Sequence, residues 1–170
     1  MSYKKGVIGF AIVVSICAVF GSSPLNLAQS TEQTYDVDAC VSMEFSSPLV
    51  RSQEMTIVNI EAKGIMRSNS ENNVFDNCTV DTKGVVMIEG KNMTVHAYMK
   101  YLDPDGDYVI FLYTQNAGEK AATTTILAGT GKYKGITGGG KAVRIAAGKP
   151  VVEGTMQLCT NHKGTFTVPK

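Results

Sequence analysis

The sequence contains no tryptophan and few charged residues, and these absences exclude several classes of protein. Charged residues make up 18% of the chain, and the 16 Lys and Arg nearly balance the 15 Asp and Glu. A strongly basic nucleic-acid-binding protein and a highly charged disordered chain are therefore both excluded. The lack of tryptophan beside 17 glycines favours short strands and turns over a helical bundle.

Residues 1–30 have the pattern of a secretory signal peptide. Two lysines precede an uncharged apolar run of 16 residues at 6–21, and the small-x-small sequence Ala28-Gln29-Ser30 follows as a cleavage site. A retained membrane anchor is the alternative, but the run is short for a span of about 20 residues. We therefore predict an exported protein, periplasmic or secreted, with one domain at 31–170 and no stable membrane span after cleavage.

Loss of the leader leaves an odd number of cysteines, Cys40, Cys78 and Cys159. In an oxidising compartment we expect one disulfide and one free thiol, with three pairings open. The pairing of Cys78 with Cys159 is favoured, because it would close most of the domain.

Charge is unevenly distributed along the mature chain. Residues 31–119 carry a net charge of −8, whereas residues 120–170 carry +7. A basic surface for anionic partners is one interpretation. Mutual compensation between neighbouring strands is the interpretation we favour.

Hydrophobic alternation with a period of two predicts strands along nearly the whole mature chain. The clearest alternation covers residues 93–101, and glycine and proline separate the segments. The predicted strands are 35–44, 58–63, 85–89, 93–101, 108–113, 123–128, 141–146, 155–159 and 165–168. About eight strands with one apolar face each are typical of an all-β sandwich or a closed antiparallel barrel, and we favour the barrel because closure removes exposed sheet edges.

Three alternating carboxylates, Asp103, Asp105 and Asp107, are candidate calcium ligands. The glycine lies too early for a calcium loop, however, and no bidentate glutamate ends the segment. Pro104 and Gly106 instead favour a hairpin turn between two strands.

A glycine-rich segment with lysines, Gly129–Gly135 followed by Gly138–Gly140, lacks the residues that a phosphate-binding loop requires. Its glycines favour tight turns and close approach of neighbouring backbones. Residues 123–143 (TTTILAGTGKYKGITGGGKAV) resemble the strand-turn-strand signature of dirigent and allene oxide cyclase barrels.

Together with Asp103–Asp107 and the closing segment 154–169 (GTMQLCTNHKGTFTVP), the same segment also resembles a family of small exported bacterial proteins. The resemblance implies an eight-stranded, calycin-like barrel with an apolar interior. It transfers no catalytic residue, because no catalytic position of the plant enzymes matches here. The Gly-x-Trp start of true lipocalins is missing.

Cys159 and His162 have the spacing of a zinc ligand pair, but no motif supplies further ligands. We expect Cys159 in a disulfide and His162 in a surface loop. No nucleophile elbow or HExxH pair is present, so the sequence predicts no catalytic residue and no cofactor.

The sequence thus supports two hypotheses of function. The first is a non-catalytic exported barrel that binds a small apolar ligand or a protein partner, and the alternative is a cyclase or isomerase that acts by shaping its substrate. The oligomeric state is left open. The residues predicted to line a cavity are Met93, Val95, Ala97, Met99 and Tyr101.

We expect signal-peptide cleavage after Ser30. N-terminal sequencing of the exported protein should begin at Thr31. An intact Met1 on exported protein would contradict this prediction.

Overall fold

The computed structural model describes residues 30–169, so the predicted signal peptide lies outside the described residues except for Ser30. These residues form nine strands and one short 3-10 turn. The elements are β1 (Glu32–Phe45), β2 (Val50–Arg51), β3 (Met55–Ser68), β4 (Thr79–Glu89), β5 (Asn92–Leu102), β6 (Tyr108–Gln115), β7 (Ala122–Gly129), η1 (Gly131–Tyr133), β8 (Thr137–Gly148) and β9 (Thr155–Thr167). No helix within residues 30–169 has the length and apolar character to cross a membrane.

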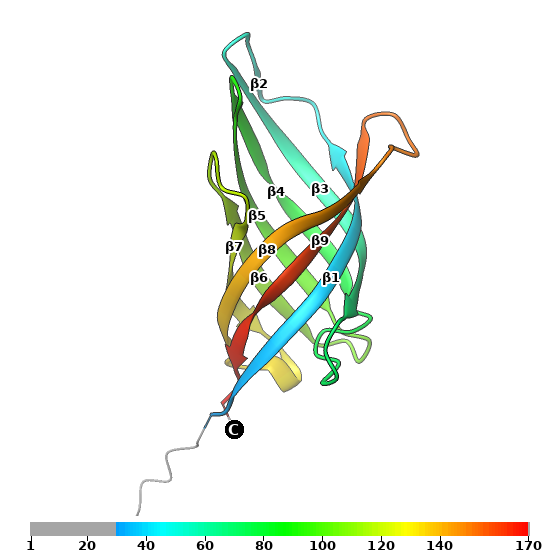
Figure 1. Ribbon diagram of the computed structural model, residues 1–170, viewed down its shortest axis with the longest axis vertical. Coiled ribbons are helices and arrows are strands. Elements are labelled where there is room, and N and C mark those ends of the chain that lie inside the picture. The colour runs from blue at the N-terminus through cyan, green and yellow to red at the C-terminus, as the bar shows by residue number, and fades with distance from the viewer. Residues whose placement is uncertain (1–29, 170) are drawn as a thin grey trace, which may run out of the picture.

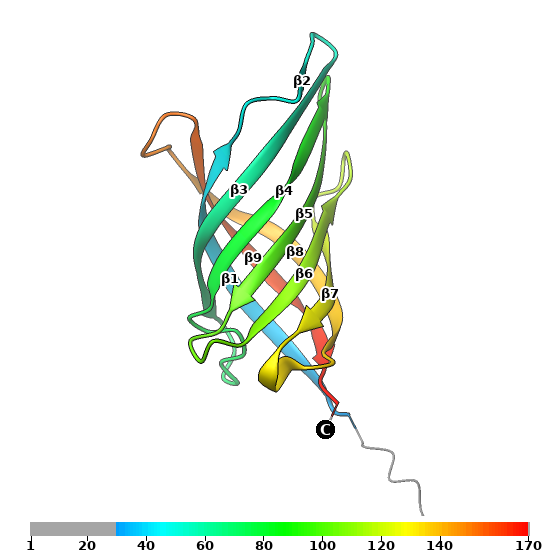
Figure 2. The same cartoon turned by 180° about the vertical axis from the view of Figure 1, so that it is seen from behind.

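Eight of the strands close into an antiparallel barrel (Figures 1 and 2). From β3 to β9 each strand pairs with the next along the chain, and β1 closes the barrel by pairing with both β9 and β3. The two-residue strand β2 only extends the edge of β3. The predicted all-β closed barrel is therefore confirmed.

Two predicted strands, 155–159 and 165–168, belong to a single strand, β9. The intervening residues Thr160–Gly164 pair with β1 on one side and β8 on the other. Polar residues face both sides of β9 here, so hydrophobic alternation gives no signal although the backbone stays extended.

Glycines allow strands to approach closely where β8 meets its neighbours. A side chain at Gly140 would run into the backbone carbonyl of Lys163, and one at Gly139 into that of Thr124. The structural interpretation of the glycine-rich segment is thus confirmed.

One end of the barrel is sealed by an aromatic side chain from the loop at 69–78. Phe75 is 1% exposed and packs edge-on against Tyr35, Tyr101 and Phe111, with ring centroids 5.6–6.0 Å apart. Its backbone has a φ of 60°, which is unfavourable for a bulky residue. Because an edge-to-face aromatic pair contributes roughly 0.5–1.5 kcal/mol, several such pairs together outweigh this strain.

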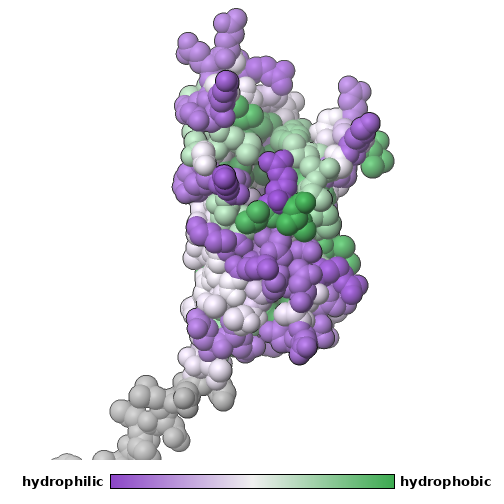
Figure 3. Space-filling model, in the orientation of Figure 1, coloured by the Kyte–Doolittle hydropathy of each residue, from purple (hydrophilic) through white to green (hydrophobic). Residues whose placement is uncertain are grey.

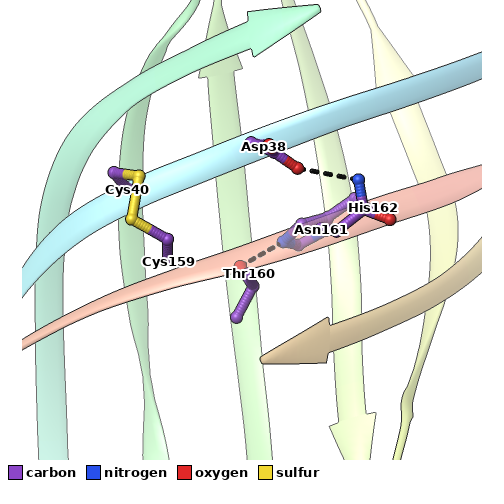
Figure 4. The surroundings of a disulfide bond; sticks show 6 residues. All are labelled: Asp38, Cys40, Cys159, Thr160, Asn161 and His162. Atoms are coloured by element: carbon purple, nitrogen blue, oxygen red, sulfur yellow. Dashed lines mark hydrogen bonds between the residues drawn. A yellow bond between two sulfur atoms is a disulfide. The ribbon is translucent and has the colours of Figure 1, made fainter. Parts of the chain in front are cut away.

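The disulfide joins Cys40 to Cys159, so the favoured pairing of Cys78 with Cys159 is wrong (Figure 4). Cys40 and Cys159 lie directly opposite each other in the β1–β9 register. Cys78 instead is a free thiol, fully buried in the core beside the sealed end. Burial raises the pKa of the Cys78 thiol to about 12.

The acidic and basic parts of the chain are not interleaved in the strand order. The strands of the basic segment, β7 to β9, are neighbours. The two parts meet where β7 pairs with β6 and where β9 pairs with β1. At the second of these seams Lys163 forms an ion pair with Asp36 at 2.8 Å. The same pairing brings Glu32 opposite Thr167, so both ends of the described chain lie at the sealed end.

We expect the Cys40–Cys159 disulfide to stabilise the barrel by on the order of 5 kcal/mol, because it closes a loop of 119 residues. Urea unfolding of the Cys40→Ser/Cys159→Ser variant should show this loss relative to wild type. As the matched control, Cys78→Ala should keep the disulfide and contain no free thiol. Two free thiols in that control would contradict the assigned pairing.

Candidate functional site: an apolar cavity open at one end

The half of the barrel opposite Phe75 is hollow. Its cavity has a volume of about 530 Å³ and is lined mostly by apolar side chains. The apolar lining residues are Ala39, Val41, Met43, Phe45, Ile60, Ala62, Val80, Val86, Ile88, Met93, Val95, Ala97, Met99, Ala142, Met156 and Leu158.

Small side chains in the middle of the barrel leave the space empty. Ala39, Ala62, Ala97 and Ala142 are all buried and all line the cavity. An eight-stranded barrel is just wide enough for its side chains to fill the interior, so a belt of alanines leaves room for a guest molecule.

The cavity reaches solvent at the end where the wall between β7 and β8 is incomplete. The pairing of β7 with β8 stops at Ala122 and Ala142, so residues 143–148 of β8 are bonded only to β9. Figure 3 shows hydrophobic surface in the upper middle of the face drawn, with hydrophilic tips above it and mostly hydrophilic surface below. The polar residues of the rim are Gln115, Glu119, Lys120 and Arg144.

The structure places four of the five predicted lining residues on the cavity wall. Met93, Val95, Ala97 and Met99 lie there, on β5. Tyr101 lies deeper, in the aromatic cluster that seals the barrel. Its side chain does point inward, but Phe75 and Phe111 fill the interior at that level.

A histidine lies at the floor of the cavity, where polar groups meet the aromatic seal. His162 is 2% exposed in β9, so its predicted position in a surface loop is wrong. The Tyr101 hydroxyl lies 3.0 Å from His162 Nδ1, and Thr160 Oγ1 lies 2.7 Å from Nε2. Figure 4 shows Thr160 and His162 on β9 beside the disulfide.

Burial keeps His162 neutral. It lowers the pKa of the imidazole to about 4, and Asp38 opposes the shift only in part. Burial also raises the pKa of the Tyr101 phenol well above its ordinary value. The floor of the cavity therefore offers neutral hydrogen-bonding groups.

A second hydroxyl lines the wall on β4. Thr82 is 7% exposed and lines the cavity. Sequence reasoning missed Thr82, Thr160 and His162, because polar residues at inward positions interrupt the apolar pattern used to find strands.

The candidate calcium ligands lie at the sealed end, in the predicted hairpin turn. The backbone N–H of Asp103 donates to the carbonyl of Asp107 at 2.8 Å. The Lys132 ammonium lies 3.0 Å from the carboxylate of Asp103 and 2.9 Å from that of Asp105, and the Tyr133 hydroxyl donates to Asp103 at 2.9 Å. Asp107 accepts from the backbone N–H of Lys132.

The turn at Asp103–Asp107 is therefore a structural element that is joined to the glycine-rich segment through Lys132 and Tyr133. Burial alone would raise the pKa of Asp103, but hydrogen bonds from Asp105, Lys132 and Tyr133 outweigh it and lower the pKa. Within the described range, no three His, Cys, Asp or Glu side chains are grouped as metal ligands would be.

The fold and the cavity define a dirigent-like barrel. Solved structures that share it include the pterocarpan synthase dirigent proteins PsPTS1 and GePTS1. PsPTS1 superposes with a TM-score of 0.55 and 16% identity over 84% of this chain and 97% of its own. The values for GePTS1 are 0.52 and 15%, over 86% and 97%. Identity this low establishes the fold alone, and neither a family model nor a curated protein matches the chain.

Stability should depend on pH through His162. Its folded pKa of about 4 lies below the ordinary 6.5, so the unfolded chain binds more protons in between. This contribution is fully present above pH 6.5, and on the order of 3 kcal/mol is lost as the pH falls through 4.

Urea unfolding between pH 7 and 4 tests this dependence. His162→Gln should flatten the profile, whereas His96→Gln, at an exposed position, should retain it. An unchanged slope in His162→Gln would contradict the assignment.

Proposed function

We propose that the protein is an exported, non-catalytic barrel that binds one small apolar molecule. The observation that carries this proposal is the apolar cavity of about 530 Å³, sealed by Phe75 at one end and open at the other. Cavities of about 300–1,000 Å³ that surround a ligand are typical of small-molecule sites. A deep cavity suits a small molecule better than it suits the surface of a protein partner.

The lining favours an apolar guest over a polar one. Transfer of apolar surface out of water stabilises binding by about 25 cal/mol per Å². A polar molecule would lose its hydrogen bonds to water and find few replacements on this wall. Lys120 and Arg144 at the rim leave room for a polar or anionic end of the ligand to stay in water.

The disulfide supports export. Disulfides persist in oxidising compartments, and the Cys40–Cys159 bridge is consistent with the signal peptide expected from residues 1–30. The periplasm and the extracellular space both satisfy this condition.

The fold shared with pterocarpan synthase dirigent proteins favours a second candidate function, a cyclase or isomerase. Such a protein would act by holding a reactive substrate in a productive shape. Turnover of a bound molecule, followed by chromatography, separates this candidate from simple binding.

Filling the cavity should abolish binding. Val95→Trp places an indole inside the hollow, and we expect at least tenfold weaker binding of a fluorescent fatty acid, because ligand and indole compete for the same volume. Val85→Trp is the matched control, since Val85 is 39% exposed on the neighbouring strand and should not affect binding.

Native mass spectrometry after gentle purification provides a second measurement. We expect a co-purifying small molecule on wild type and on Val85→Trp, and none on Val95→Trp. Equal fatty-acid binding by both tryptophan variants would place the ligand outside the barrel.

A further inference from the structure

Hydrogen bonds at the cavity floor determine which way the Thr160 hydroxyl points. His162 is held between the Tyr101 hydroxyl, 3.0 Å from Nδ1, and Thr160 Oγ1, 2.7 Å from Nε2. A neutral imidazole has one N–H donor and one acceptor nitrogen, so these two contacts have opposite directions. Either Tyr101 donates to His162 and His162 to Thr160, or the chain of bonds is reversed.

Burial of Tyr101 selects between the two directions. Its phenol is 1% exposed, and His162 Nδ1 is its hydrogen-bonding partner among the described residues. In the reversed direction the Tyr101 O–H would have no acceptor, and a buried unsatisfied donor costs about 1–3 kcal/mol. We therefore assign the proton of His162 to Nε2, with Tyr101 donating to Nδ1.

In this tautomer Nε2–H donates to the Thr160 oxygen, and the hydroxyl hydrogen of Thr160 remains available. Thr160 lines the cavity, and its side chain bonds no other described group. The Thr160 hydroxyl is thus an oriented donor at the end of the cavity nearest the seal, and most of the surrounding lining is apolar.

We propose that Thr160 donates a hydrogen bond to the bound ligand, and that the cavity selects apolar molecules with an acceptor oxygen, such as a ketone or ester carbonyl, at their deep end. This inference rests on the proposed function. A pure hydrocarbon would leave the Thr160 donor unpaired, whereas a carbonyl oxygen satisfies it. Sites built to pair a polar group discriminate strongly against analogues that lack it.

A matched pair of probes tests the proposal. The first is 6-propionyl-2-(dimethylamino)naphthalene, a fluorescent ketone whose emission shifts to the red when its carbonyl accepts a hydrogen bond. The second is 6-propyl-2-(dimethylamino)naphthalene, which has the same skeleton without the oxygen. The ratio of their dissociation constants, compared between variants, isolates the hydrogen bond from the difference in hydrophobicity.

We expect Thr160→Val to change this ratio roughly fivefold in favour of the hydrocarbon, the effect of one net hydrogen bond. The emission of the bound ketone should shift to the blue, and Thr160→Ser should restore both properties. Thr125→Val is the matched control, because Thr125 is exposed on β7 and does not line the cavity. It should leave both the ratio and the emission unchanged.

Nitrogen NMR of labelled wild type gives a readout that needs no variant. We expect His162 Nδ1 unprotonated and Nε2 protonated, and a protonated Nδ1 would overturn the proposal. An unchanged ratio in Thr160→Val would also overturn it while leaving the proposed function intact. A change in the ratio confined to Thr82→Val would do the same, because Thr82, which also lines the cavity, would then be the donor. If neither probe binds wild type, the proposed function fails and the donor role fails with it.

Discussion

The packing of Phe75 across one end of the barrel is the interaction on which the rest of the structure depends. Its ring contacts aromatic side chains from β1, β5 and β6, so a single loop residue joins strands that are distant in the sequence. Eight strands enclose a continuous channel, and an unsealed channel would admit water along its whole length. The seal covers Tyr101, whose hydroxyl lies 3.0 Å from His162 at the cavity floor.

Stability and the capacity to bind are separated along the barrel axis. Near the sealed end, large rings fill the interior, and the turn at Asp103–Asp107 is tied to η1 through Lys132 and Tyr133. Toward the open end, alanines leave a hollow and the wall loses its pairing beyond Ala142. A cavity contributes no packing energy of its own, so the dense half must supply the stability that the hollow half lacks.

The sequence predicts the barrel well because most strands carry one apolar face. The alternation at 93–101 indicated five lining residues, and four of them lie on the cavity wall. It failed for Tyr101, because no pattern along one strand reveals that Phe75 fills the barrel at that depth. It also failed for His162, since an inward polar residue looks like a loop residue until a partner from another strand is known. The disulfide depends in the same way on register, which places Cys40 opposite Cys159.

The pairing of Glu32 with Thr167 has a practical consequence for orientation. Both ends of the described chain leave the barrel on the side of the seal, away from the mouth (Figures 1 and 2). A support or fusion partner joined at either end would attach to the sealed end of the barrel. The mouth would then face the surrounding solution, and immobilisation would leave the route into the cavity unobstructed.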